Sequence, residues 1–138
     1  MPDFPTQLPA LVVILTPWVD FNDDELPRHG HGFRDGMTRQ ELEDSARGWW
    51  NVAPAEALKR PYIVAAFDGI TRGVWAFDAT VAPKSASPAL CQRLGVSERR
   101  WGFGVRAAPV EIWDAFVGRN GRGLPYRPYR ELRYWPPV

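Results

Sequence analysis

Short apolar runs that contain β-branched residues are the clearest pattern along this chain. The run at residues 11–15 (LVVIL) has the length of a strand and predicts a buried one. Residues 99–107 (RRWGFGVRA) and 131–135 (ELRYW) predict two later strands. Residues 19–36 lack such a run, and their acidic, glycine-rich composition predicts a loop.

A hairpin is the most specific local prediction. The β-rich runs at residues 62–67 (YIVAAF) and 70–78 (ITRGVWAFD) are separated only by Asp68 and Gly69. Asp-Gly is a preferred two-residue hairpin turn because both central residues must adopt a positive φ. Gly73, inside the second run, predicts a bulge or a close approach of another backbone.

Helical periodicity begins at a capping box. Thr38 and Glu41 stand three residues apart, as reciprocal capping of a helix N-terminus requires. A helix over residues 39–50 then places four apolar residues on one face: Leu42, Ala46, Trp49 and Trp50. Shorter helices are predicted at residues 54–59, 90–94 and 109–117, the last ending at Gly118.

The order of these elements predicts one α+β domain. The strands are joined by loops or hairpins and not by regular βαβ crossovers, which favours a small curved antiparallel β-barrel with two or three short helices. The domain is expected to span residues 10–138, after a loose N-terminal arm at residues 1–9 that contains three prolines.

Composition excludes several classes. No apolar run approaches the ~20 residues that cross a bilayer, so no membrane association is expected. The N-terminus carries Asp3 and no basic flank, unlike a signal peptide, which makes cytoplasmic the expected localisation. Cys91 is the single cysteine, so an internal disulfide and a cysteine-cluster zinc site are excluded.

Charge is distributed unevenly along the chain. Residues 1–69 hold 6 basic and 11 acidic side chains, a net of −5, whereas residues 70–138 hold 11 and 5, a net of +6. Two oppositely charged faces, or two halves that interleave in the fold, are both consistent with this. Of 17 basic residues only Lys59 and Lys84 are lysine, a bias that fits a GC-rich bacterial genome and also fits phosphate binding.

Motifs for catalysis are weak. His29 and His31, beside an acidic run, are the candidate ligands for a transition metal, but no third fixed ligand accompanies them. The chain has no nucleophile elbow, P-loop or dinucleotide fingerprint, so no cofactor is expected and an enzyme is not favoured.

Tryptophan beside arginine and glycine is the most unusual feature of the composition. Four of the seven tryptophans lie in such contexts: Trp49, Trp50, Trp75 and Trp101. Aromatic faces that stack on bases and arginines that contact phosphate are typical of proteins that bind single strands or flipped bases. The alternative is that these rings are core material.

These residues resemble the PUA-like superfamily, whose relatives include the EVE, ASCH and YTH domains. The resemblance rests on Arg47-Gly48-Trp49-Trp50, on Arg72-Gly73-Val74-Trp75 after the hairpin turn, and on Arg100-Trp101-Gly102-Phe103. It implies a small barrel whose cleft reads RNA or modified bases in DNA. It further implies Trp49, Trp50 and Trp101 as stacking rings, and Arg72, Arg100 and Arg119 as phosphate contacts.

The sequence therefore predicts a non-catalytic module that binds RNA or DNA. Two alternatives stay open. One is a protein–protein interaction component, such as part of a toxin–antitoxin or defence system, whose basic half docks an acidic partner. The other is a small metal-dependent enzyme that uses His29 and His31.

Overall fold

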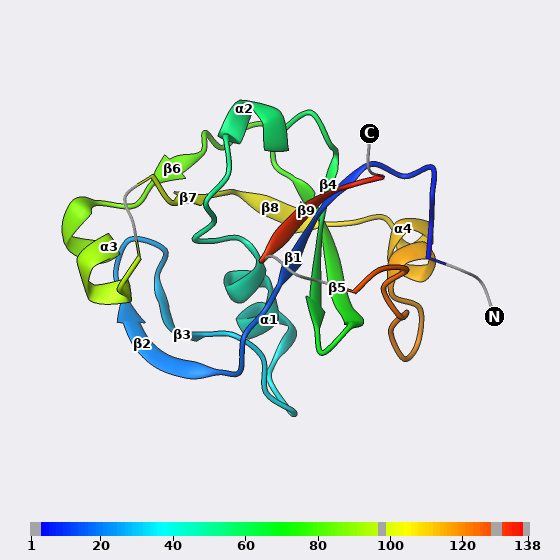
Figure 1. Cartoon of the computed structure of the whole chain (residues 1–138), viewed down its shortest axis with the longest axis horizontal. Coiled ribbons are helices and arrows are strands. Elements are labelled where there is room, and N and C mark those ends of the chain that lie inside the picture. Colours follow the sequence, from blue (N-terminus) through cyan, green and yellow to red (C-terminus); the bar gives the residue numbers. More distant parts are fainter. Residues whose placement is uncertain (1–3, 97–98, 128–130, 137–138) are drawn as a thin grey trace.

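The computed structural model describes residues 4–96, 99–127 and 131–136. Its elements follow one another along the chain (Figure 1), with the β2–β3 hairpin and α3 at one end of the molecule and α4 at the other. The strands are β1 Ala10–Ile14, β2 Val19–Asp23, β3 Arg28–His31, β4 Tyr62–Phe67, β5 Ile70–Phe77, β6 Lys84–Ser85, β7 Trp101–Gly102, β8 Val105–Ala107 and β9 Leu132–Trp135. The helices are α1 Arg39–Ala46, α2 Pro54–Ala57, α3 Pro88–Leu94 and α4 Val110–Phe116.

A five-stranded sheet in the order β8-β5-β4-β1-β9 forms the centre of the fold. The α+β class is thus confirmed, and each of the four helices in the described residues overlaps one of the helical ranges predicted from the sequence. The expected all-antiparallel arrangement is wrong, because β1 and β4 pair in parallel, with Val12 opposite Val64. The long connection from β1 to β4 carries β2, β3, α1 and α2, so neighbours in the sheet are distant in sequence. In the described part of the chain the sheet does not close into a barrel.

Both faces of the sheet are covered, which explains the uninterrupted apolar runs of β1 and β4. Leu11, Val13 and Ile63 pack on the face that α1 covers, where Leu42 and Ala46 meet them. The alternate residues Val12 and Val64 pack on the opposite face against Phe116 of α4. The alternation of strand side chains thus divides one apolar run between two cores.

The hairpin prediction is confirmed in detail. Asp68 and Gly69 connect β4 and β5 with φ values of 54° and 78°, the positive values that a tight hairpin turn needs. The register shifts between Ala65, which faces Gly73, and Ala66, which faces Thr71. This is the bulge that Gly73 predicts, and a Cβ on Gly73 would lie 2.4 Å from the ring of Trp75.

Helix α1 begins as predicted and ends early. Both hydrogen bonds of the Thr38–Glu41 capping box are present. The helix stops at Ala46 and not at residue 50, because the Arg47 carbonyl accepts a hydrogen bond from Phe103 N–H. Trp49 and Trp50 therefore lie beyond the helix and not on its apolar face.

Two further predictions are wrong. Residues 19–36, predicted as a loop, contain the β2–β3 hairpin. Its two polar strands form a small sheet that is separate from the main one. Residues 99–107 are not one strand, since β7 pairs with β6 and β8 pairs with β5.

The segment before β1, expected to be a loose arm, is anchored where the structure describes it. Phe4 is buried and packs edge-on against Phe116 and Trp135. The indole N–H of Trp135 also donates to the Pro5 carbonyl at 2.6 Å. No helix of the described residues is long and apolar enough to span a membrane.

Thr71 joins β5 to the chain that follows α4, and we predict that it is needed for stability. Its buried hydroxyl donates to the Phe116 carbonyl at 2.7 Å and accepts from Arg122 N–H at 2.8 Å. Thr71→Val keeps the shape and leaves both backbone groups without this partner, so it should lower the unfolding free energy by about 1–3 kcal/mol.

Urea denaturation measures this change. Thr80→Val is the matched control, because the Thr80 hydroxyl is exposed and bonds only to Asp78. It should alter stability by no more than ~0.5 kcal/mol. Equal effects of the two substitutions would show that the Thr71 hydroxyl does not hold these elements together.

Candidate functional site

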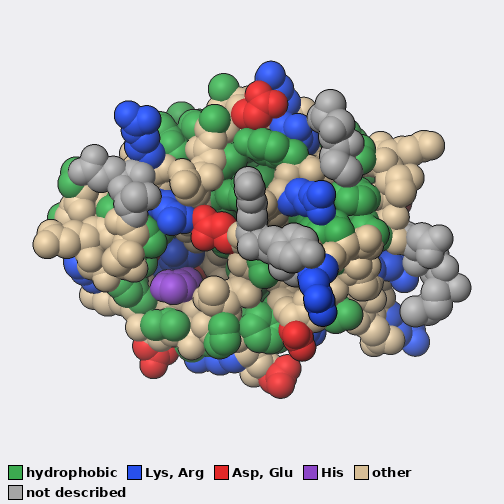
Figure 2. Space-filling view, viewed as in Figure 1, with side chains coloured by type: hydrophobic (Ala, Val, Ile, Leu, Met, Phe, Trp, Pro, Cys, Tyr) green, Lys and Arg blue, Asp and Glu red, His purple; other side chains and the backbone are tan. Residues whose placement is uncertain are grey.

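A cavity of about 220 Å³ lies where the β2–β3 hairpin, the end of α1 and the start of β9 meet. Figure 2 shows a hollow on this face, with a histidine side chain inside it and basic and acidic side chains at its rim. Its walls combine apolar and polar residues: Ile14, Leu15, Thr16, Arg28, His31, Gly32, Ser45, Gly48, Trp49, Trp50, Leu94, Val96, Arg100 and Glu131.

A buried ion pair forms one side of this cavity. Arg28 Nε lies 3.0 Å from Asp23 Oδ2, with 3% and 0% of the two side chains exposed. The Arg28 Nη1 atom also donates to the carbonyls of Asp44 and Gly48, at 2.6 and 2.8 Å. The ion pair thus attaches the β2–β3 hairpin to the last turn of α1 and to the residues that follow it.

Asp23 accepts several hydrogen bonds, which fix its charge. Burial acts to raise the pKa of this carboxyl, but the Leu26 amide, the Trp49 indole and Arg28 outweigh burial and hold the pKa below its ordinary value of 3.8. The indole N–H of Trp49 lies 2.9 Å from Oδ2. Asp23 therefore orients both Arg28 and the Trp49 ring.

Trp49 and Trp50 form the aromatic part of the cavity wall, each with only 7% of its surface exposed. Their indole nitrogens already donate, Trp49 to Asp23 and Trp50 to the Ala46 carbonyl. The two predicted stacking residues are therefore fixed walls and not open platforms.

Glycines bring the two tryptophan-containing segments together. Trp50 and Trp101 exchange two backbone hydrogen bonds of 2.9 Å, which pairs residue 50 with β7. A Cβ on Gly48 would lie 2.6 Å from the Leu26 side chain and 3.2 Å from Gly102 Cα, so a larger residue would have to displace both neighbours. The glycines of both motifs thus have a packing role.

Polar atoms without partners are the most informative feature of the cavity. Among the described residues, the buried Oγ of Ser45 and the buried Nε of Arg100 make no hydrogen bond. Buried polar groups are normally paired, so a ligand with complementary groups would remove a desolvation penalty here.

Arg100 and Glu131 stand at the rim of the cavity. Arg100 Nη1 and Glu131 Oε1 form an ion pair at 2.5 Å, with 15% and 43% of the side chains exposed. Glu131 therefore offers an acceptor beside the donors of Arg100.

The two histidines occupy different surroundings. His31 lines the cavity, and burial, with a further contribution from Arg28, lowers its pKa from the ordinary value of 6.5. His29 is 72% exposed and contacts Glu41 at 3.1 Å. No group of three potential metal ligands occurs among the residues that the structure describes.

The remaining predicted site residues do not line the cavity. Trp101 is half-buried and packs against the main core next to Trp50. Arg72 lies over the rings of Phe33 and Phe67 and donates to the Phe67 carbonyl. Arg119 is exposed after α4, so the structure gathers Trp49, Trp50 and Arg100 and leaves the other three outside.

Sequence reasoning missed Asp23, Arg28, Ser45 and Glu131. One signal existed, because Ser45 falls on the same helical face as Leu42 and Ala46, where a polar residue is unusual. Asp23 and Arg28 carried no such signal, since they lie in an acidic segment with several equivalent carboxylates.

Comparison of the chain with protein-family models, curated proteins and solved structures gives no match.

We predict that the cavity wall depends on the charge of Asp23. Asp23→Asn leaves Arg28 buried without its counter-charge, which should lower the unfolding free energy by about 3–5 kcal/mol. Asp24→Asn removes the same charge from a side chain that is 80% exposed and should change little. Chemical denaturation compares the two, and similar stabilities would contradict the role of the ion pair.

Acid should destabilise the protein through His31. Because its pKa is lowered in the folded state, the unfolded chain binds the proton first as the pH falls below 6.5, so stability declines over that range. His31→Gln should lose less stability than the wild type between pH 8 and pH 5 in thermal melts. His29→Gln, which replaces the exposed ring, should leave the loss of stability unchanged. If His29→Gln reduced the loss and His31→Gln did not, the prediction for His31 would be wrong.

Proposed function

We propose that this chain is a non-catalytic nucleic-acid-binding module that takes a single unpaired base of RNA or DNA into the tryptophan-walled cavity. Arg100 at the rim and arginines of the basic second half would contact the backbone. The resemblance to the PUA-like superfamily, which implies a small curved barrel, is part of this proposal.

The size of the cavity supports a ligand of one ring system. At about 220 Å³ it is smaller than the ~300–1,000 Å³ of pockets for drug-sized ligands. The fixed rings of Trp49 and Trp50 supply flat apolar walls, which suit a planar heterocycle. The sugar and phosphate would stay outside, near Arg100.

The unpartnered polar atoms carry the proposal. Ser45 Oγ can donate and accept, whereas Arg100 Nε only donates. Glu131 and the imidazole of His31 complete a set that matches the mixed donors and acceptors of a base edge. An apolar ligand would leave these groups unpaired and is therefore disfavoured.

Fluorescence titration with short RNA, single-stranded DNA and duplex DNA tests this function. The unpaired strands should bind more tightly than the duplex, and affinity should fall log-linearly with salt because phosphate contacts release counterions. Saturable binding of an acidic protein partner, without any nucleic-acid binding, would favour the interaction-component alternative.

Ser45→Ala separates binding from stability. Removing an unpaired buried hydroxyl should leave the unfolding free energy unchanged or raise it, while affinity for the strand falls roughly two- to ten-fold through the loss of one hydrogen bond. Ser85→Ala is the control, because Ser85 is exposed and outside the cavity.

Arg100→Gln should weaken binding and reduce the salt dependence of the affinity. Arg106→Gln is its matched control, since Arg106 is an exposed arginine on β8 that does not line the cavity. Equal losses in both variants would point to a diffuse electrostatic surface and would contradict recognition in the cavity.

A further inference from the structure

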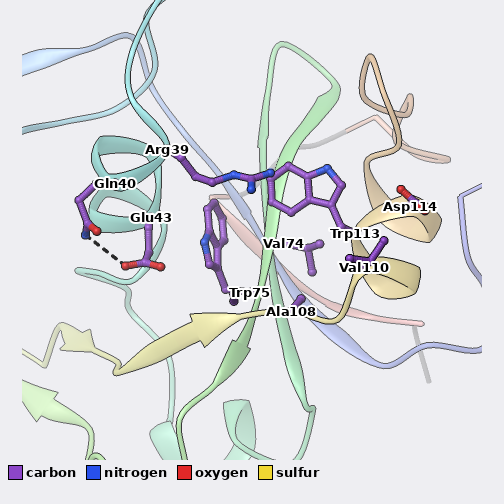
Figure 3. Close-up of a pocket in the computed structure, with 10 residues that line it drawn as sticks. Arg39, Gln40, Glu43, Val74, Trp75, Ala108, Val110, Trp113 and Asp114 are labelled. Carbon is purple, nitrogen blue, oxygen red and sulfur yellow. Dashed lines mark hydrogen bonds between the residues drawn. The ribbon is translucent and has the colours of Figure 1, made fainter.

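A second cavity, of about 400 Å³, lies at the edge of β5 between α1 and α4. β8 pairs with residues 75–77 of β5. Residues 122–124 approach residues 69–71, where the same strand begins. The cavity occupies the interval between these two pairings. Figure 3 shows α1 on one side, α4 on the other, and Trp75 rising from β5 between them.

Two tryptophans at right angles form the aromatic part of this cavity. The rings of Trp75 and Trp113 have an interplanar angle of 89° and centroids 6.2 Å apart. Trp75 is 2% exposed and is therefore a fixed wall, while Trp113 on α4 is half-buried. Val74, Ala108 and Val110 also line the cavity, and Val110 is 74% exposed.

The face of Trp113 is occupied by a cation of the chain itself. The Arg39 side chain extends from α1 across the cavity, and its Cζ lies 4.0 Å from the centroid of the Trp113 ring (Figure 3). The structure gives this guanidinium no hydrogen bond or ion pair to any described residue, and Arg39 is exposed. A solvent-exposed cation–π contact is weak, so this occupant is easily displaced.

Two other arginines on aromatic rings are held more firmly. Arg60, over Tyr134, also donates to the Glu56 carbonyl and pairs with the Glu56 carboxylate. Arg72, over Phe33, also donates to the Phe67 carbonyl. Unlike these two arginines, Arg39 is held among the described residues by its contact with Trp113 alone.

Two carboxylates give the cavity a negative charge. Glu43 and Asp114 line it from α1 and α4, and neither forms an ion pair with a described residue. Glu43 accepts only from the neutral Gln40 amide, at 3.1 Å. With Arg39 in place the net charge of the lining is −1, and it becomes −2 when Arg39 moves away, which attracts an external cation.

We infer that this cavity is a binding site for a weakly hydrated organic cation, a guanidinium or an alkylated ammonium, and that Arg39 is its internal competitor. Perpendicular aromatic rings, an apolar floor and nearby carboxylates are the chemistry that recognises such ions. Hydrated inorganic cations gain little from it. This site is separate from the proposed base-binding cavity and does not depend on it.

The test is titration of the full-length chain with tetramethylammonium chloride and, separately, with methylguanidinium chloride. Sodium chloride at equal ionic strength is the reference, and the indole N–H signals of Trp75 and Trp113 are followed by NMR. Saturable shifts of these two signals with an organic cation and none with sodium are expected. The tighter of the two binders then identifies whether the ligand is a guanidinium or an alkylated ammonium.

Variants make the test specific. Arg39→Ala should tighten binding about two- to five-fold, because the internal competitor is removed. Glu43→Gln should weaken binding, and Trp113→Leu should abolish it. Arg60→Ala, which removes an arginine from a ring outside the cavity, should change nothing.

Three results would overturn the inference. The first is unchanged or weaker binding after Arg39→Ala. The second is an equal response to sodium. The third is a response confined to the signals of Trp49 and Trp50 in the other cavity. Glu43→Gln keeps the test decisive if Trp113→Leu fails to fold, because it alters only a half-buried surface carboxylate.

Discussion

The buried ion pair between Asp23 and Arg28 determines how one end of the molecule is assembled. A charge removed from water must be balanced and its hydrogen-bonding groups paired, or the desolvation penalty destabilises the fold. Asp23 meets this requirement with two backbone amides, the Trp49 indole and Arg28, and Arg28 does so with carbonyls at the end of α1. These bonds connect segments from three elements. The cavity with its tryptophan walls results from that arrangement.

The excess of arginine has a partly internal explanation in the structure. Six arginines of the described residues lie over aromatic rings of the same chain: Arg34, Arg39, Arg60, Arg72, Arg93 and Arg133. Arginine combines charge with a flat, weakly hydrated face, so it covers aromatic surface better than lysine does. Aromatic rings beside arginines in a sequence are therefore ambiguous, because the arginines can stack within the chain and need not meet a phosphate. The acidic and basic halves also meet directly, as in the contact between Arg93 and Asp24.

The two cavities contain different kinds of incompletely paired group. In the first, Ser45 and Arg100 carry buried polar atoms that the described residues do not pair. In the second, Arg39 is paired only through a weak contact with Trp113 and can be replaced by a similar group. Incomplete pairing of a polar or charged group in a concave site is the common physical basis of both proposals.

The sequence by itself determined the elements that depend on local interactions. These elements are the turn at Asp68 and Gly69, the bulge at Gly73 and the capping box of α1. Each depends on residues a few positions apart, and the side chains of these residues set their backbone preferences. The sequence also predicted Trp49, Trp50 and Arg100 as site residues; these three line one cavity, and their role in binding stays a prediction. Tertiary structure decided the rest. The parallel pairing of β1 with β4 depends on contacts between distant segments. So do the bonds that join the Asp23–Arg28 pair to Gly48 and Trp49, and the exposure of each tryptophan. Such contacts follow from the total burial of the chain, which no local pattern encodes.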